Sequence, residues 1–324
     1  MRIGDIELPS RVVLGPMAGV TNLPYREFMK PFGVGLGVSE MISDCGIDYD
    51  NSATIRYTKT LDMERPVALQ LFGANKEKSV EAVKRLEAMA QYDILDLNFG
   101  CPVPKVTKTG AGSAWLTRVD ELGDYVRAIV NASSKPVTAK IRLGWDEDSI
   151  NVFEVSRILE SAGAKAVAIH CRTKAQGYAG KANYKAIRGL QQELSIPVIV
   201  SGDIFDLESV QKANEIVKPE GFMVARGGMG NPYLITQINA YLNDGTILPN
   251  PGIKEQIGYA RDYAEKMIAY FGEATGVVMM RSVLPSFFSG LPSSKSIRIA
   301  LYTCYTKEQI ESVFNGALKR YGQD

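Results

Sequence analysis

One short stretch, residues 97–102 (Leu-Asn-Phe-Gly-Cys-Pro), brings together residue types that could carry out proton chemistry. The apolar residues before Asn98 indicate a buried strand, and Gly100 and Pro102 indicate that no regular element continues past it. Cys101 would then lie in the first turn after the strand, at the start of a loop rich in glycine and polar residues. A cysteine in that place suits a proton donor or a nucleophile. The alternative is a small buried hydrophobic residue.

Seven further apolar runs have the character of that strand, and amphipathic patterns lie between them. We expect strands at residues 11–18, 34–40, 66–72, 93–98, 136–142, 165–170, 196–201 and 221–225. We expect helices at residues 22–30, 75–89, 119–131, 151–161, 184–192, 206–215 and 231–241. Strands that alternate with helices at this spacing imply parallel pairing through right-handed crossovers. The sequence therefore predicts an α/β fold, a (β/α)8 TIM barrel, with an open doubly wound sheet as the alternative.

Prolines and glycines interrupt the pattern after the last barrel helix. Residues 244–252 have the composition of a linker. From residue 253 onward the periodicity is helical, with no clear strand. We therefore expect a catalytic barrel domain at residues 1–243, a linker at 244–252 and a small helical-bundle domain at 253–324.

Composition limits the class of protein. The 324 residues are 45% hydrophobic, enough for a large core. The four cysteines are widely spaced and there is a single histidine, so we expect neither a metal site nor a disulfide framework. The amino terminus lacks an apolar signal core and no apolar run could cross a bilayer, so we expect a cytoplasmic protein with no membrane partner. We also expect a monomer. The net charge of +1 says little about nucleic acids.

Polar residues recur where the predicted strands end, and a barrel gathers those ends into one mouth. The loops after the last two strands, residues 201–203 (Ser-Gly-Asp) and 225–228 (Ala-Arg-Gly-Gly), are rich in glycine. Glycines there let backbone N–H groups approach a phosphate, and Arg226 adds charge. Left-handed turns also need glycine, so either loop alone is a weak signal. Together they predict a phosphorylated ligand. The strand-end residues are Met17, Gln70, Asn98, Lys140, Arg142, His170, Arg172, Asp203 and Arg226.

Three of these side chains suggest what the ligand is. Lys140 at a buried strand end is costly unless it meets an anion or an electron-rich ring; the alternative is a lysine that extends to solvent. The amide of Gln70 could read the polar edge of a flat ring. His170 is interpreted as a ligand contact, although a structural role is the alternative. The mouth would thus bind a phosphate and the edge of a flat ring, and it would hold a lysine and a cysteine beside them. This combination points to flavin mononucleotide (FMN) chemistry.

Six motifs in order make the chain resemble the tRNA-dihydrouridine synthases, most closely the bacterial type B group. The resemblance covers essentially the whole chain. The motifs are Gly15-Pro16-Met17-Ala18-Gly19-Val20-Thr21, Val38-Ser39-Glu40-Met41, Leu97-Asn98-Phe99-Gly100-Cys101-Pro102, Lys140-Ile141-Arg142-Leu143-Gly144-Trp145, His170-Cys171-Arg172-Thr173 and Ala225-Arg226-Gly227-Gly228.

The resemblance implies an FMN-dependent reduction of uridines in the tRNA D-loop to 5,6-dihydrouridine. NADPH would reduce the flavin, the reduced flavin would deliver hydride to C6 of the uracil, and Cys101 would protonate C5. The tRNA base would have to be extruded into the pocket. The cofactor-binding residues would be Pro16, Met17, Gln70, Lys140, His170, Ser201, Gly202, Asp203, Ala225, Arg226 and Gly227.

Contacts to the tRNA are also expected. By resemblance, Asn98 matches a residue that reads the uracil edge, and Arg172 matches one placed between substrate and flavin. We further expect Arg142, Lys105 and Arg281 to contact the tRNA.

Several positions depart from the family pattern. Ser201-Gly202-Asp203 stands where many relatives have Asn-Gly-Asp, and Ala225-Arg226-Gly227 stands where many have Gly-Arg-Ala. In many relatives a lysine follows the arginine that corresponds to Arg281, and this chain has no lysine at that position. Residues 252–324 hold nine basic and seven acidic residues, a weak electrostatic surface for RNA. The sequence therefore leaves open which uridine is modified.

Two other functions fit parts of the pattern. One is an FMN barrel that reduces a small molecule, as a dihydroorotate dehydrogenase or an ene-reductase does; it would not need the helical tail. The other is a tRNA-binding protein that assists folding, in which flavin is structural or absent and Cys101 is dispensable.

Overall fold

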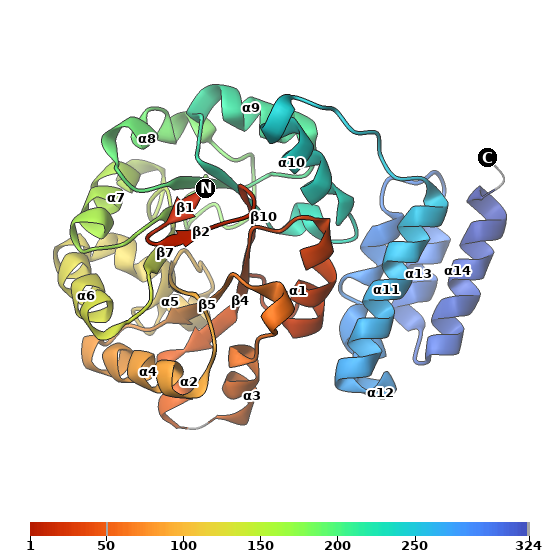
Figure 1. Ribbon diagram of the computed structural model, residues 1–324, viewed down its shortest axis with the longest axis horizontal. Coiled ribbons are helices and arrows are strands. Elements are labelled where there is room, and N and C mark those ends of the chain that lie inside the picture. The colour runs from red at the N-terminus through yellow and green to blue at the C-terminus, as the bar shows by residue number, and fades with distance from the viewer. Residues whose placement is uncertain (50, 323–324) are drawn as a thin grey trace.

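In the described residues, 1–49 and 51–322, eight parallel strands close into a barrel (Figure 1). In this computed structural model each strand pairs with the next along the chain, and the last pairs with the first, so the sheet closes on itself. The closure confirms the predicted TIM barrel, because an open doubly wound sheet keeps two edges. The strands are β3 (Val12–Leu14), β4 (Leu36–Ser43), β5 (Val67–Phe72), β6 (Ile94–Phe99), β7 (Val137–Arg142), β8 (Val167–His170), β9 (Val198–Ser201) and β10 (Gly221–Val224).

Alternate residues along a strand point to opposite sides of the barrel wall. On β6, Ile94 belongs to the core inside the barrel, whereas Leu95 and Leu97 belong to the core between the wall and the helices. Asp96 and Asn98 therefore share the inner side with Ile94. The same alternation directs the polar residues of the other strands into the barrel rather than into the helical layer.

Helices cover the outside of the barrel. The side chain of Asn22 caps α1 (Leu23–Met29) by accepting a hydrogen bond from the backbone N–H of Tyr25, and the Asn75 side chain caps α4 (Lys76–Met89) in the same way. The other covering helices are α6 (Val119–Ala132), α7 (Val152–Ser161), α8 (Leu190–Glu193), α9 (Leu207–Val217) and α10 (Tyr233–Asp244).

One predicted helix is wrong, and several short elements were not predicted. Residues 184–192 form a 3₁₀ turn, η6 (Tyr184–Ile187), and the single-turn α8, because Gly189 between them has a left-handed φ of 87°. An amino-terminal hairpin places Ile3 against the core inside the barrel. The unpredicted elements are β1 (Arg2–Ile3), β2 (Ile6–Glu7), α2 (Asp44–Asp48), α3 (Ser52–Ile55) and α5 (Pro104–Thr107).

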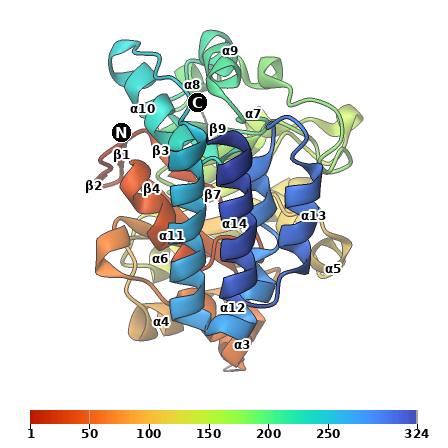
Figure 2. The same cartoon turned by 90° about the vertical axis from the view of Figure 1, so that its right-hand side faces the viewer.

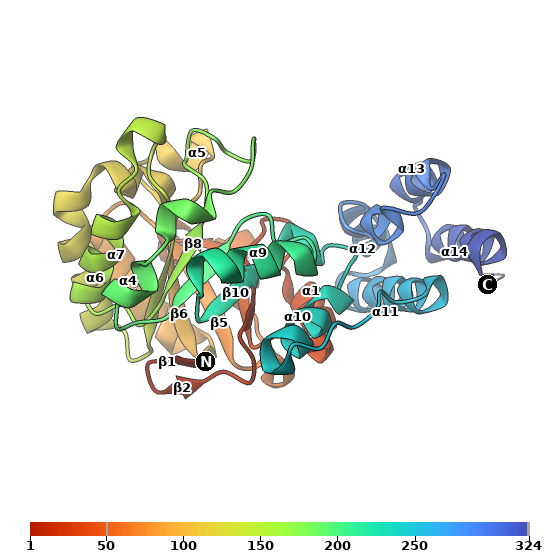
Figure 3. The same ribbon diagram turned by 90° about the horizontal axis from the view of Figure 1, so that it is seen from above.

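The described part of the chain after residue 252 is helical and stands beside the barrel (Figures 1 and 3), so that it lies in front of the barrel in Figure 2. This confirms the expected helical C-terminal region, although residues 323–324 lie outside the described residues. Between Asp244 and Ile253 the chain forms no helix or strand. None of the described helices is long and apolar enough to span a membrane. The C-terminal helices are α11 (Ile253–Phe271), α12 (Glu273–Met280), α13 (Lys295–Thr303) and α14 (Lys307–Tyr321).

An aromatic cluster joins α1 of the barrel to the C-terminal helices. The ring of Phe28 on α1 lies 5.5 Å from that of Tyr263 on α11 and 6.1 Å from that of Phe287 in the turn η8 (Leu284–Phe288). At the edge of the cluster, Lys266 pairs with Glu27 at 2.9 Å. Buried aromatic contacts of this kind stabilise both partners, so the helices are fixed against the barrel.

We predict that Phe28→Ala lowers the free energy of unfolding by about 3–5 kcal/mol, because the side chain is buried among other rings. Tyr302→Ala, at a ring that is 56% exposed on α13, is the control and should change it by less than about 0.5 kcal/mol. Urea unfolding followed by circular dichroism measures both. Equal losses in the two variants would contradict a stabilising role for the junction.

Candidate functional site

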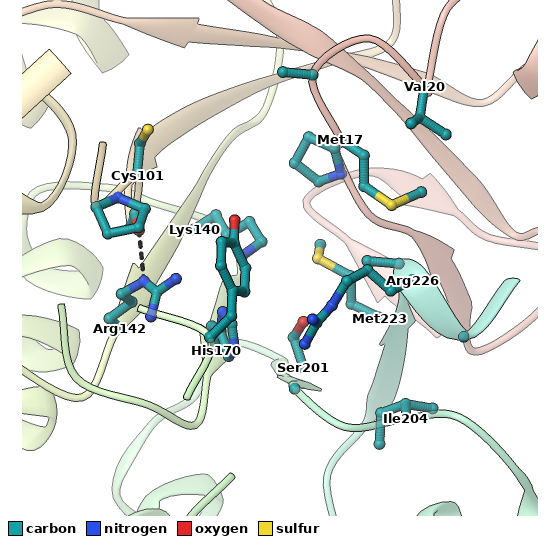
Figure 4. Close-up of a pocket in the computed structure, with 18 of the residues that line it drawn as sticks. Met17, Val20, Cys101, Lys140, Arg142, His170, Ser201, Ile204, Met223 and Arg226 are labelled. Carbon is teal, nitrogen blue, oxygen red and sulfur yellow. Dashed lines mark hydrogen bonds between the residues drawn. The ribbon is translucent and has the colours of Figure 1, made fainter. Parts of the chain in front are cut away.

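A cavity of about 340 Å³ opens at the carboxyl ends of the barrel strands. Figure 4 shows Cys101 on one wall and Met17 on the opposite wall, with Lys140 and His170 between them. Most residues predicted from the sequence line this cavity. They are Pro16, Met17, Asn98, Cys101, Lys140, Arg142, His170, Ser201, Gly202, Asp203, Ala225, Arg226 and Gly227.

Four predicted residues do not line the cavity. Gln70 is fully buried beneath Asn98, to which its side chain is hydrogen-bonded. Arg172 is buried behind the wall, and Lys105 is exposed on α5. Arg281 lies in the helical region, where its guanidinium stacks 4.2 Å from the ring centroid of Tyr305 and donates to the carbonyl oxygen of Cys304. Their expected contacts with cofactor and tRNA stay predictions.

The loop that carries Cys101 is held by side chains from two strands. Asn98 Oδ1 accepts hydrogen bonds from the backbone N–H groups of Gly100 at 3.1 Å and of Cys101 at 2.9 Å. Arg142 Nε donates to the carbonyl oxygen of Gly100 at 2.7 Å. Gly112 packs against the same loop, and a Cβ there would lie 2.9 Å from the Cys101 carbonyl oxygen. The position of the thiol is therefore fixed by groups that the cavity itself contains.

The Cys101 thiol is 7% exposed, and burial raises its pKa. The nearby charges of Arg142 and Lys140 oppose that increase without reversing it. A thiol whose pKa is raised keeps its proton at neutral pH, which suits a proton donor better than a thiolate nucleophile.

Lys140 has no hydrogen-bond or ion-pair partner among the described residues, although it lines the cavity and is only partly exposed. Burial, together with the charge of Arg142, lowers its pKa to about 8, although the Asp96 carboxylate opposes the change. The ammonium group is thus available to a ligand, and an anionic or electron-rich ligand would relieve the cost of burying it.

The loops after β9 and β10 meet backbone to backbone. A Cβ at Gly227 would lie 1.9 Å from the carbonyl oxygen of Ile204, and Gly202 has a left-handed φ of 103°, so both positions require glycine. Arg226 is exposed and forms no ion pair with any of the described residues. Its guanidinium carbon lies 4.9 Å from the ring centroid of Tyr178 and 5.5 Å from that of Phe205. Its N–H groups remain available for an anion.

An ion pair between buried Arg172 and half-buried Asp203 holds the segment that follows β8. Arg172 Nη2 donates to Asp203 Oδ2 at 2.8 Å and to the carbonyl oxygen of Gly180. Arg172 Nη1 lies 3.4 Å from His170 Nε2. Burial lowers the pKa of His170 well below its ordinary value, and four neighbouring cations add to the effect, so the imidazole is neutral. Since Nε2 faces a cation that can only donate, we assign the proton to Nδ1.

Some residues of the site were missed by the sequence reasoning. Tyr178 lines the cavity between Arg142 and Arg226, yet it lies in a segment without periodicity, between two glycines. Phe205 and Met41 also line the cavity. Asp96 lies below it, and a carboxylate within an apolar strand is a signal that could have found it.

The amino-acid sequence is similar to those of known proteins over almost its whole length. The model of the family described as dihydrouridine synthase (Dus) matches residues 13–320. The chain belongs to the dihydrouridine synthase family. It is 36% identical over 302 residues to a probable tRNA-dihydrouridine synthase of Rickettsia conorii, covering 93% of this chain and 91% of that relative. It is 35% identical over 300 residues to tRNA-dihydrouridine synthase B of Pseudomonas aeruginosa, covering 92% and 90%. These matches confirm the resemblance seen in the six motifs.

The barrel also resembles solved structures outside the dihydrouridine synthases. Histamine dehydrogenase from Rhizobium sp. 4-9 superposes with a TM-score of 0.57 at 14% identity, over 74% of this chain and 47% of that chain. At this identity the likeness concerns the fold alone. Among the described residues, no group of three or more His, Cys, Asp or Glu side chains is arranged to hold a metal ion.

We predict that Lys140 titrates near pH 8 in the ligand-free protein, whereas exposed lysines titrate near 10.4. NMR of ¹³C-methylated lysines measures this, with Lys140→Met to assign the signal. The folded protein binds fewer protons than the unfolded chain between about pH 8 and the ordinary value of 10.5. Its free energy of unfolding should therefore rise across that window relative to Lys140→Met. A Lys140 signal that titrates with the exposed lysines would contradict the burial of an unpartnered charge.

Proposed function

We propose that this chain reduces uridines in the D-loop of tRNA to 5,6-dihydrouridine, with FMN as its cofactor and NADPH as electron donor. The observation that carries the proposal is a protonated thiol, Cys101, held across one cavity from the unpartnered cation Lys140, in a chain of the dihydrouridine synthase family. The relatives named tRNA-dihydrouridine synthase cover nearly the whole chain, which supports tRNA as the substrate.

The cavity fits a flavin mononucleotide. Its volume of about 340 Å³ is in the range of ligand pockets, and its lining combines apolar walls with a few polar groups. Lys140 offers an ammonium group to an electron-rich ring edge. At the other side, Arg226 lies with Gly202 and Gly227, two positions packed too closely against His170 and Ile204 to accept a side chain. A cation beside glycine backbone N–H groups is the combination that a phosphate site uses.

Each predicted cofactor residue has a place in this arrangement. The backbone of Pro16 and Met17 would flank the ring, and neutral His170 would offer a hydrogen bond without adding charge. Ser201, Gly202, Asp203, Ala225, Arg226 and Gly227 would surround the phosphate. Gln70 would act from beneath, through Asn98. When bound and reduced, the flavin supplies the hydride that adds to C6 of the uracil.

Cys101 supplies the proton that adds to C5. Its buried thiol holds that proton at neutral pH, and its loop cannot move without breaking the hydrogen bonds from Gly100 and Cys101 to Asn98. After donation, the thiolate is stabilised by Arg142 and Lys140, whose charges favour the ionised sulfur, and solvent returns the proton.

The uracil must leave the tRNA loop to reach Cys101, because the thiol lies inside a cavity and not on the surface. Asn98 and Arg142 line that cavity and would contact the base. Lys105 on exposed α5 would contact the RNA backbone near the mouth. The helices α11–α14, with Arg281, would hold the rest of the tRNA, mostly through shape and phosphates. The protein would act in the cytoplasm; that it is a monomer stays a prediction.

We predict that Cys101→Ala lowers the rate of dihydrouridine formation by about 10²- to 10⁴-fold, the usual contribution of a general acid. Unmodified tRNA is incubated with protein, FMN and NADPH, digested and analysed by mass spectrometry for a uridine heavier by two hydrogens. NADPH oxidation by the variant is the control and should persist. A wild-type protein that oxidises NADPH but leaves tRNA unchanged would favour a small-molecule flavoenzyme instead.

We predict that Arg226→Ala weakens FMN binding by about 10- to 100-fold and riboflavin binding much less, since a hydrogen bond to a charged group contributes about 1.5–3 kcal/mol. Flavin fluorescence quenching measures both affinities. Arg188→Ala, at an exposed arginine outside the cavity, is the matched control. An equal loss for FMN and riboflavin would mean that Arg226 does not bind the phosphate.

A further inference from the structure

One buried carboxylate below the cavity has no part in the mechanism above. Asp96 is 3% exposed and points into the barrel from β6, one inward position before Asn98. Its Oδ1 accepts a hydrogen bond from Thr138 Oγ1 at 2.6 Å, and its Oδ2 accepts one from Gln70 Nε2 at 2.6 Å. A buried acid in an apolar barrel is costly, so its hydrogen bonds need an explanation.

These bonds continue without interruption to the Cys101 loop. Asn98 Nδ2 donates to Gln70 Oε1 at 2.8 Å. Asn98 Oδ1 in turn accepts from the backbone N–H groups of Gly100 and Cys101. The chain of hydrogen bonds thus runs from Asp96 through two side-chain amides to the loop that holds the proton donor.

Asp96 and the backbone N–H groups of the loop fix the direction of this chain from its two ends, because the carboxylate can only accept and the N–H groups can only donate. A carboxylate can only accept, so Gln70 must turn its NH₂ group toward Asp96 and its oxygen toward Asn98. If Gln70 were flipped, its NH₂ group would face the NH₂ group of Asn98, and Asn98 could relieve the clash only by giving up its bonds to the loop. A protonated Asp96 can keep this direction as well, by donating from Oδ1 to the Thr138 hydroxyl while Oδ2 still accepts from Gln70.

The same direction decides what Asn98 offers to the cavity. Its oxygen is already used by two backbone N–H groups. Its nitrogen donates one hydrogen to Gln70 Oε1 and the other to Met41 Sδ, with 3.0 Å between Nδ2 and Sδ, and Met41 also lines the cavity. A thioether sulfur is a weak acceptor, which a stronger acceptor can replace. A base that approaches Asn98 therefore meets a donor and must present an acceptor, such as a carbonyl oxygen.

We propose that Asp96 is a positioning residue for the reaction: through Gln70 it fixes the orientation of the Asn98 amide, and with it both the donor presented to the base and the place of Cys101. This inference rests on the proposed function. Asp96 touches neither substrate nor cofactor, and its effect should appear in kcat for tRNA rather than in the fold.

The Asp96→Asn variant tests the direction of the hydrogen bonds while leaving the packing of the side chain nearly unchanged. An asparagine has nearly the same volume and can both donate and accept, and the Thr138 hydroxyl can adapt to either orientation. In the wild type a flipped Gln70 meets two mismatches, its oxygen against the Asp96 carboxylate and its NH₂ group against the NH₂ group of Asn98, whereas in Asp96→Asn only the second remains. The number of hydrogen bonds is kept, and the cost of the flipped orientation falls.

The experiment compares wild type, Asp96→Asn and Gln70→Met. Asp44→Asn is the matched control, since Asp44 is a buried acid with a Ser79 hydroxyl partner at 2.9 Å, outside the cavity. We expect Asp96→Asn to lower kcat for tRNA by about 10- to 100-fold, the range for one hydrogen bond to a charged group, with KM nearly unchanged. NADPH oxidation should stay at the wild-type rate. Gln70→Met should lower kcat similarly, and the double variant should be no worse than either single one.

A second readout does not depend on turnover. The side-chain amide NMR signals of Gln70 and Asn98, assigned from Gln70→Met and Asn98→Ala, should be single in wild type and doubled or broadened in Asp96→Asn. Additive losses in the double variant, single sharp amide signals in Asp96→Asn, or an equal loss in Asp44→Asn would overturn the inference. A wild type that forms no dihydrouridine would overturn the proposed function instead, while the amide signals would still test the orientation.

Discussion

The hydrogen bonds between β10 and β3 are the constraint on which the rest of the structure depends. They join Val224 to Leu14, residues more than two hundred positions apart in the chain. Once they form, the loop at Pro16–Met17 and the loop at Ala225–Gly227 become adjacent lips of the same cavity. The Pro16–Met17 loop meets the Ala225–Gly227 loop only when the sheet closes, so the complete site exists only in the complete barrel.

Closure also concentrates positive charge. Lys140, Arg142, Arg172 and Arg226 all approach the cavity. Among the described residues that line it, Asp203 is the only carboxylate that pairs with one of them, Arg172. Burial lowers the pKa values of Lys140 and His170, and the charges of neighbouring cations lower them in the same direction. A site with this excess of charge is destabilised when empty and stabilised by an anionic ligand, which is the electrostatic setting that a phosphate-bearing cofactor needs.

Much of this could be predicted from the sequence because strand ends in a parallel barrel converge whatever the details of packing. Asn98, Cys101 and Lys140 follow apolar runs directly, and all three line the cavity. The hairpin around Ile3 and the break at Gly189 were missed because two-residue strands and single-turn helices carry too little periodicity.

The direction of a polar side chain was harder to predict than its position. Strand-end position placed Gln70 and Arg172, and the family resemblance placed Arg281, near the expected surfaces. Each has a partner within the protein instead: Asp96, Asp203 and the Cys304 carbonyl oxygen. Such choices depend on competition between neighbours that are distant in sequence, and periodicity contains no information about them.

The aromatic junction fixes the distance between the C-terminal helices and the cavity. Helix α1 begins directly after the loop that forms one lip of the cavity, and its Phe28 is packed against α11. The interval between the helical surface and the cavity is therefore set by ring-on-ring contact, not by the covalent connection at residues 245–252. That connection can vary in length without altering the distance. The protein therefore presents its helical surface at a fixed separation from the cavity, whatever the length of the linker.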